Sequence, residues 1–178
     1  MVRVRGGVPR GIRDARPDDR EAVRALTLAA YEEYAAAMPE AFWAVYRRNL
    51  VATLDTPGPE DRIVAEDGGV VVGSVFLYPP EAAAYGARAQ GSRWPEVRLL
   101  AVPPSARGRG IGQALMDECV HRARVLGAEA LGLHTMDMMR AAVRRYERMA
   151  FVRAPETDFA PGGGILVKGY RLKLTGAQ

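Results

Sequence analysis

The chain has 178 residues and a formal net charge of +4; 48% of the residues are hydrophobic and 26% are charged. This length suits one globular domain with a single core and is short for two. No apolar run approaches the roughly 20 residues that a membrane-spanning helix needs. A single cysteine, Cys119, excludes an internal disulfide, and neither it nor the two histidines have metal-ligand spacing. We therefore expect a cytoplasmic domain without a metal and without a membrane partner.

The positive charge is spread along the chain rather than gathered in one block. Nearly all basic residues are arginines, with Lys168 and Lys173 the only lysines. The sequence has no helix-turn-helix, zinc-finger or aromatic RNA-binding signature. A basic surface also suits an anionic small molecule. We expect no nucleic-acid partner, and filter binding at varied salt tests this expectation.

Hydrophobic periodicity and turn residues divide the chain into strands and helices. Residues 1–10 lack the apolar stretch of a secretory signal and are interpreted as a flexible leader, followed by a single domain at 11–178. The predicted strands are 12–15, 62–66, 70–77, 97–102, 130–135, 151–153 and 165–174. The predicted helices are 17–34, 42–50, 111–126 and 140–149. This order predicts one mixed α/β layer fold without internal repeats.

Several local features refine this outline. Asp67-Gly68-Gly69 predicts a hairpin turn, and Gly127 is expected to end the third helix. Gly169 is expected to interrupt the last strand. The connection 79–95 has no assigned element and is a candidate wall of an acceptor site. One apolar face of the third helix is formed by Ile111, Leu115, Cys119, Ala123 and Leu126.

A loop rich in arginine and glycine joins the strand 97–102 to the third helix. At such a place the free amides and the positive end of the helix dipole converge, and together they bind anions. Glycines let the backbone approach a phosphate closely. The loop lacks the Gly-Lys-Ser/Thr ending of a nucleoside triphosphate loop, and its spacing does not fit Gly-x-Gly-x-x-Gly. The loop reads Arg107-Gly108-Arg109-Gly110-Ile111-Gly112.

Residues 96–153 resemble the GCN5-related N-acetyltransferase (GNAT) superfamily. The loop matches its signature Arg/Gln-x-x-Gly-x-Gly/Ala, and the segment 96–103 is similar to the strand that precedes it. Residues 142–151 are similar to the family segment Ala-x-x-x-Tyr-Glu-Lys/Arg-x-Gly-Phe. Two positions depart from the pattern: Met139 replaces an Asn found in many members, and Ala150 replaces a Gly.

The resemblance implies a fold and a cofactor site. The fold is a central mixed sheet of about six to seven strands flanked by helices, in which a splayed pair of parallel strands forms the cleft for coenzyme A. These strands are expected at 97–102 and 130–135. Acetyl-CoA is then the acyl donor, and no metal is needed. The expected donor-binding residues are Leu100, Ala101, Val102, the loop from Arg107 to Gly112, and Met139.

The resemblance also assigns catalytic candidates. Tyr146 matches a tyrosine near the CoA sulfur and is expected to protonate the leaving thiolate, although packing beside Phe151 would also account for it. Glu96 matches a position where some members place a base, although a solvent-facing carboxylate at the end of the strand would also account for it. Glu32, Glu33 and His134 are competing candidates for the base. Alternatively, the two glutamates lie on an exposed helical face without a catalytic role. His134 is alternatively a hydrogen-bonded histidine of the core.

Other reactive or aromatic side chains have simpler interpretations. We expect Cys119 to be a buried structural thiol and His121 to be solvated. An aromatic group is interpreted first as core and second as a wall of the acceptor pocket; it consists of Tyr31, Tyr34, Phe42, Trp43 and Tyr46.

The predicted function is an N-acetyltransferase that moves an acetyl group from acetyl-CoA to a primary amine of a small molecule, peptide or protein, by direct attack in a ternary complex. Met139 leaves a second hypothesis, a domain that senses acyl-CoA without significant turnover. The sequence does not identify the acceptor amine. It leaves the oligomeric state open, and a homodimer is compatible with it.

Overall fold

The computed structural model describes residues 11–81 and 92–174 of the chain. The predicted leader 1–10 and most of the connection 79–95 lie outside the described residues. The strands are β1 (Gly11–Asp14), β2 (Asp61–Asp67), β3 (Val70–Tyr78), β4 (Glu96–Ala101), β5 (Ala130–Thr135), β6 (Val152–Arg153), β7 (Phe159–Gly162) and β8 (Ile165–Lys173). The helices are α1 (Arg20–Tyr31), α2 (Glu40–Asp55), α3 (Ile111–Val125) and α4 (Arg140–Arg148), with short 3-10 turns η1 (Pro17–Asp19), η2 (Glu32–Ala37), η3 (Pro104–Ala106) and η4 (Pro155–Thr157).

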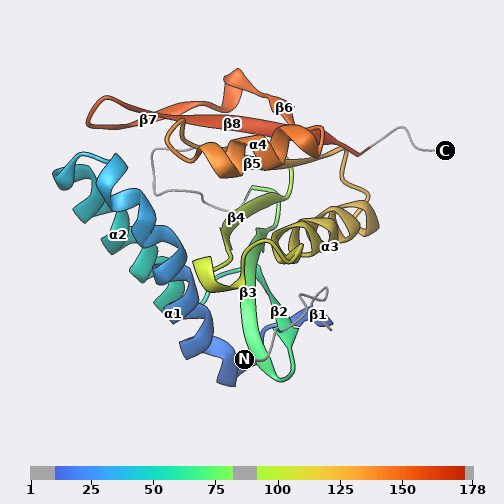
Figure 1. Ribbon diagram of the computed structural model, residues 1–178. Coiled ribbons are helices and arrows are strands. Elements are labelled where there is room, and N and C mark those ends of the chain that lie inside the picture. Colours follow the sequence, from blue (N-terminus) through green and yellow to red (C-terminus); the bar gives the residue numbers. More distant parts are fainter. Residues whose placement is uncertain (1–10, 82–91, 175–178) are drawn as a thin grey trace.

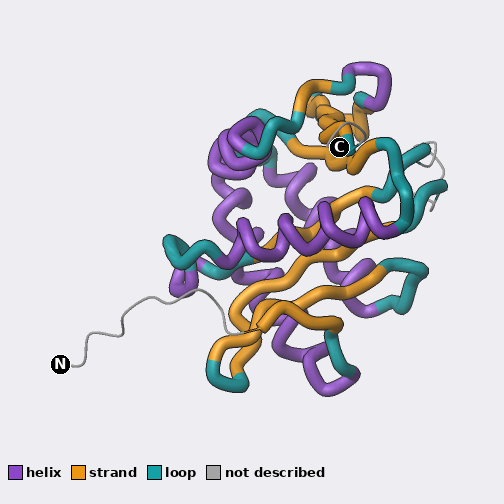
Figure 2. The backbone as a smooth tube through the Cα atoms, turned by 90° about the vertical axis from the view of Figure 1, so that its right-hand side faces the viewer, coloured by secondary structure: helices purple, strands orange, loops and turns teal. Residues whose placement is uncertain are grey.

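The strands form one mixed sheet in the order β1-β2-β3-β4-β5-β8-β6, and β7 pairs with β8. Every neighbouring pair is antiparallel except β4 with β5, which is parallel. The helices lie on both sides of the strands, with α1 and α2 on one side and α3 on the other (Figures 1 and 2). The predicted mixed α/β architecture is therefore confirmed.

Each face of the sheet is covered by an apolar helix face. On the α3 side, residues such as Leu115 and Met116 pack against Ile63, Val75 and Leu131. On the other side, residues of α1 and α2 pack against β2 and β3 in a separate cluster formed by Val23, Leu50, Leu54, Val64, Phe76 and Tyr78. Each cluster follows from alternation along the strands, because successive side chains point to opposite faces.

Helix boundaries follow from local chemistry. The chain enters α1 through η1, where Pro17 stands at the start and the Asp19 carboxylate accepts a hydrogen bond from the Arg16 amide at 2.6 Å. The helix α3 begins after Gly110, which has a left-handed φ of 74°, and is followed by Gly127 with a φ of 69°. Both positions favour glycine because a Cβ atom is strained there. The predicted end of α3 at Gly127 is confirmed.

Three details of the sequence prediction are wrong. Leu126 is 66% exposed, because α3 ends one residue earlier and the chain turns away from the core. Gly169 does not interrupt the last strand, since it pairs with His134 inside β8. A Cβ atom there would lie 1.7 Å from the Thr157 hydroxyl, so this glycine makes room for η4. The strand β7 was not predicted, because the segment around Pro161 lacks strand periodicity.

Within the described residues, no helix combines the length and the apolar character needed to cross a membrane.

Candidate active site

The parallel strands β4 and β5 separate after a short paired stretch. Glu96 pairs with Gly132 and Val97 pairs with Leu133, whereas β4 continues to Ala101 and β5 to Thr135. Beyond the paired residues, the edge of β4 that faces β5 has no partner in that strand. The structure therefore has a split in the middle of the sheet, at the two strands where the sequence predicted it.

A bulge in β4 accompanies the split. Ser74 of β3 pairs with Ala101 and Phe76 pairs with Arg98, so β4 has one extra residue between these pairs. Within this stretch Leu99 has a φ of 51°, which is uncommon for a residue with a Cβ atom. Bulges bend a strand and redirect its polar groups. This bulge lies directly beyond the last residue of β4 that pairs with both neighbours, where β4 and β5 separate.

The loop from Arg107 to Gly112 lies where β4 leads through η3 into α3. Gly108 and Gly110 both have a φ of 74°, and no atom lies within 4 Å of a Cβ placed on either. These glycines are explained by backbone conformation, and they lead into the first turn of α3, whose amides have no partner within the helix. Gly112 is different, because the guanidinium group of Arg145 fills the space beside it.

Carboxylates from two other segments hold the loop arginines. Arg107 makes a two-pronged ion pair with Glu33 of η2, with N–O distances of 2.7 and 3.0 Å. Arg109 pairs with Asp67 in the hairpin between β2 and β3. An incoming anion therefore meets guanidinium groups that are already positioned, but it must compete with these carboxylates for their N–H groups.

Glu96 lies at the apex of the split and is 1% exposed. Its Oε1 atom accepts hydrogen bonds from Arg98 Nε at 2.9 Å and from His134 Nδ1 at 3.2 Å. Burial alone would raise the pKa of Glu96, but the hydrogen bond from His134 and the charge of Arg98 outweigh it, so the pKa lies below its usual value. The carboxylate is ionised at neutral pH, and a solvent-facing position for it is excluded.

His134 on β5 donates through both ring nitrogens. Nδ1 faces the Glu96 carboxylate, and Nε2 lies 2.9 Å from the Thr157 carbonyl oxygen. Both partners only accept hydrogen bonds, so the protonated imidazolium satisfies them best. Burial would lower the pKa of His134, but the hydrogen bond and charge of Glu96 outweigh it and raise the pKa above its usual value. Of the two interpretations of His134, a catalytic base or a hydrogen-bonded histidine of the core, the structure agrees with the second.

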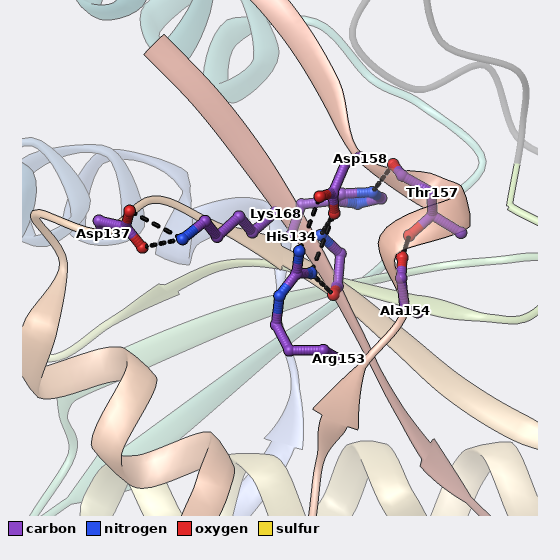
Figure 3. Close-up of polar contacts among 8 residues, drawn as sticks. His134, Asp137, Arg153, Ala154, Thr157, Asp158 and Lys168 are labelled. Atoms are coloured by element: carbon purple, nitrogen blue, oxygen red, sulfur yellow. Dashed lines mark hydrogen bonds and ion pairs between the residues drawn. The ribbon is translucent and has the colours of Figure 1, made fainter.

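A polar network fixes the segment that carries Thr157 (Figure 3). The Thr157 hydroxyl donates to the Ala154 carbonyl at 2.8 Å, and Asp158 accepts from both Arg153 and the Gly169 amide. Arg153 also donates to the Gly169 carbonyl. Because these contacts tie η4 to β8, the carbonyl that orients His134 is held in place.

Tyr146 of α4 lies in the core on the α3 side. Its ring centroid is 5.9 Å from that of Phe151, and this contact is compatible with both interpretations of the residue. Burial is the main cause of a pKa raised well above the usual value, and the neighbouring Tyr34 raises it further. The phenol is therefore protonated at any physiological pH and is able to donate a proton or a hydrogen bond.

Met139 is buried where α4 begins. It packs with Met38, Met136 and Val167, and its sulfur accepts a weak hydrogen bond from the Thr135 hydroxyl at 3.7 Å. A thioether offers neither a strong donor nor a strong acceptor. Any contact that Met139 makes with a ligand is therefore apolar. Around these methionines lie partly buried rings, namely Tyr31, Tyr34, Phe42, Trp43, Tyr46 and Phe159.

The remaining candidates are engaged in ion pairs, buried as a thiol, or exposed. Glu33 is engaged with Arg107, and Glu32 lies 3.7 Å from Arg47 in an exposed pair. Cys119 is buried, and burial raises its pKa to about 12, as expected for a structural thiol. His121 is exposed, as predicted. Two carboxylates in the described residues are almost fully covered, those of Glu96 and Glu60, and of these Glu96 lies at the split.

Sequence reasoning missed two arginines of this site. Arg98 lies two residues after Glu96 on the same strand face, a spacing that could have identified it. Arg145 approaches the loop from α4. Arg145 and Gly112 are 33 residues apart in the chain, and the only sequence signal for their contact is the high arginine content of α4.

Comparison with known proteins agrees with this geometry. Residues 20–151 match the model of the Acetyltransferase (GNAT) family. A mycothiol acetyltransferase from Propionibacterium freudenreichii subsp. shermanii is 32% identical over 160 residues, covering 86% of this chain and 47% of the relative. The chain thus spans about half the length of that relative.

Solved structures share the whole architecture. A GCN5-related N-acetyltransferase from Rhodopseudomonas palustris has a TM-score of 0.66 at 20% identity and covers 97% of this chain and 100% of that chain. A GNAT acetyltransferase from Brucella melitensis, solved with acetyl-CoA, has a TM-score of 0.56 at 22% identity and covers 94% and 90%. This likeness defines an acyltransferase fold. With the match over residues 20–151, it follows that the chain belongs to the GNAT family of acetyltransferases.

Proposed function

We propose that this protein is an N-acetyltransferase that transfers the acetyl group of acetyl-CoA to a primary amine of a small molecule or peptide. One observation carries the proposal: β4 and β5 separate directly beyond Val97, so the edge of β4 that has no partner in β5 runs from the buried, ionised Glu96 toward the loop at the start of α3. Membership of the acetyltransferase family supports it.

Donor binding would use the backbone of β4 and the loop. Leu100 lies in the bulge, and Ala101 and Val102 follow it. Backbone groups at the edge without a partner in β5 suit the amide-rich pantetheine arm as an added strand does, and the Val102 carbonyl accepts a hydrogen bond from Arg107 at 3.1 Å. The loop amides and Arg107 suit the pyrophosphate. Acetyl-CoA supplies an activated thioester, so the protein needs chiefly to position the amine and manage two protons.

Tyr146 is proposed to supply the proton that the leaving thiolate takes up. Its raised pKa keeps the phenol protonated, which is the state that an acid requires. A backbone amide near Leu100 is proposed to hydrogen-bond the thioester oxygen as negative charge develops there.

Glu96 is proposed to receive the proton that the amine loses, directly or through a water molecule. The cations Arg98 and His134 keep Glu96 ionised but also weaken it as a base. A weak base suits an amine that reaches the cleft already neutral. The rate should therefore follow the fraction of neutral amine, and this fraction is larger at neutral pH for an α-amino group than for an alkyl amine.

The relatives suggest where the search for an acceptor begins. The curated relative named above is a mycothiol acetyltransferase, so the small-molecule amine acceptor that this name implies is the first to test. Met139 supports a second candidate function, because its buried thioether offers no strong hydrogen bond to acetyl-CoA. That function is a domain that binds acyl-CoA without useful turnover.

Thiol release separates the two functions. The purified protein is mixed with acetyl-CoA and a panel of amines that contains the acceptor of mycothiol acetyltransferases, α-aminoacyl amides and alkyl amines. Amine-stimulated release of CoA thiol is expected. Binding of acetyl-CoA without stimulated release by any amine would favour the sensor, and absence of binding would exclude both.

A further inference from the structure

The guanidinium group of Arg145 rests on the first turn of α3. A Cβ atom placed on Gly112 would lie 1.6 Å from Arg145 Nη1 and 2.8 Å from Cζ. Gly112 has no left-handed φ, unlike Gly108 and Gly110. The residue is therefore a glycine because the side chain from α4 occupies the place where a methyl group would be.

This position is electrostatically unfavourable for a cation by itself. The N-terminus of a helix carries partial positive charge and free amide groups. The loop that leads into this helix end carries two more guanidinium groups, those of Arg107 and Arg109, and each of these has a carboxylate partner. Throughout the two stretches that the structure describes, no carboxylate pairs with Arg145. An anion bound between Arg145 and the helix end would reverse the sign of the interaction.

We propose that Arg145 is a phosphate ligand for the donor, and that it closes the pyrophosphate site from the α4 side while the loop closes it from the other. The inference rests on the proposed use of acetyl-CoA. The acyl donor then contacts the residue directly before Tyr146 on α4. Arg145 lies close enough to Tyr34 and Tyr146 for its charge to act on both phenols.

The experiment compares two donors and two neighbouring arginines. Arg145→Gln is measured with acetyl-CoA and with acetyl-pantetheine, which has the same thioester but no pyrophosphate. Arg144→Gln is the matched control, because Arg144 is exposed on the same helix and its loss changes the net charge equally. Arg145→Lys keeps the charge but loses the fork of donors.

Arg145→Gln is expected to raise KM for acetyl-CoA about tenfold to a hundredfold, as the loss of a charge-assisted hydrogen bond does. Its KM for acetyl-pantetheine and its kcat should stay within about twofold of wild type. Arg144→Gln should change neither KM, and Arg145→Lys should fall between wild type and Arg145→Gln. Circular dichroism and the unfolding temperature report whether each variant is folded.

Three outcomes would overturn the proposal. An unchanged KM for acetyl-CoA would mean that Arg145 does not contact the donor. A lower KM would mean that it blocks the phosphate site. An equal rise for both donors would mean that it supports α4 rather than the phosphates. If wild type turns over neither donor, the proposed function fails instead, and calorimetric binding of CoA and pantetheine to the same variants still tests Arg145.

Discussion

Tyr146 combines two roles that a single substitution can separate. Its ring packs against Phe151 in the core, whereas its hydroxyl has a raised pKa and stays protonated. Tyr146→Phe keeps the ring and removes only the proton donor. We expect kcat to fall about a hundredfold or more, in the range of acid–base catalysis, with little change in KM for acetyl-CoA or in unfolding temperature. Steady-state kinetics at saturating acceptor measure it, and an unchanged kcat would end the acid assignment.

The pair formed by Glu96 and His134 makes stability depend on pH in a defined direction. The pKa of His134 is raised from 6.5, so its contribution is complete below pH 6.5 and is lost as the pH rises through the folded-state value. The pKa of Glu96 is lowered from 4.5, so its contribution is complete above pH 4.5 and is lost as the pH falls through the folded-state value. The pair therefore stabilises the fold most between these two pH values.

His134→Gln tests this pH dependence. The difference in unfolding temperature between wild type and variant should be largest near pH 5–6 and should shrink toward pH 9. Differential scanning calorimetry across that range measures it, with the exposed His121→Gln as the matched control. A difference that is constant, or that grows at alkaline pH, would contradict an imidazolium ion at position 134.

At the scale of elements, positions 110 and 112 of one loop are both glycine, but for different reasons. Gly110 has a left-handed φ with open space around it, so Gly110→Ala should cost about 1 kcal/mol of stability through backbone strain alone. Gly112→Ala should instead displace the side chain of Arg145 and raise KM for acetyl-CoA. Urea unfolding and donor kinetics distinguish them. If Gly112→Ala still raised KM in an Arg145→Gln background, the two residues would act independently.

The C-terminus of α2 depends on one side chain from β2. Arg62 donates to the carbonyl oxygens of Leu54 at 2.9 Å, Thr53 at 3.2 Å and Thr56 at 2.7 Å. Its Nε also bonds Glu60 at 2.8 Å, and the Glu60 side chain is almost fully buried. Arg62 therefore satisfies groups that helix geometry leaves without partners and neutralises a buried carboxylate.

Arg62→Met should lower the free energy of unfolding by about 2–4 kcal/mol, since it leaves both the helix end and the buried charge without a partner. Adding Glu60→Gln should recover part of this loss by removing the charge. Urea denaturation of the single and double variants measures both effects. Strictly additive losses would show that the charge of Glu60 does not contribute.

The sequence was sufficient for the elements whose causes are local. The hairpin at Gly68 and Gly69, the glycine that follows α3 and the strand β5 each depend on neighbouring residues, and each was predicted. The bulge at Leu99 and the strand character of Gly169 depend on what lies across the sheet. No local pattern encodes those contacts, so they appear only in the folded chain.

The candidate site divides in the same way. The loop and Tyr146 were found because each lies in a contiguous motif of its own, whereas the state of Glu96 depends on partners up to 38 residues away. His134 and Arg98 hold this carboxylate ionised and lower its pKa, which makes it a weaker base than a free carboxylate. Charge state is a property of the assembled site, and sequence alone left three competing carboxylates.

At the scale of the whole molecule, the sheet consists of two parts that share few contacts. The strands β1 to β4 form one part, β5 to β8 form the other, and in the described structure they are joined as strands only at Glu96–Gly132 and Val97–Leu133. A donor seated between β4 and β5 would supply the missing hydrogen bonds of the β4 edge. Binding should therefore stabilise this seam more than the rest of the sheet.

Hydrogen exchange tests this at the level of single strands. With CoA at about 100 times its Kd, the folded state should gain about 2.7 kcal/mol, and amides at residues 98–102 should exchange more slowly. Amides in the antiparallel pair of β1 and β2 serve as the control, because both strands are paired there without the ligand. Pantetheine without phosphates should protect 98–102 but not the first turn of α3. Protection confined to α3 would mean that the phosphates bind while the cleft between the strands stays unused.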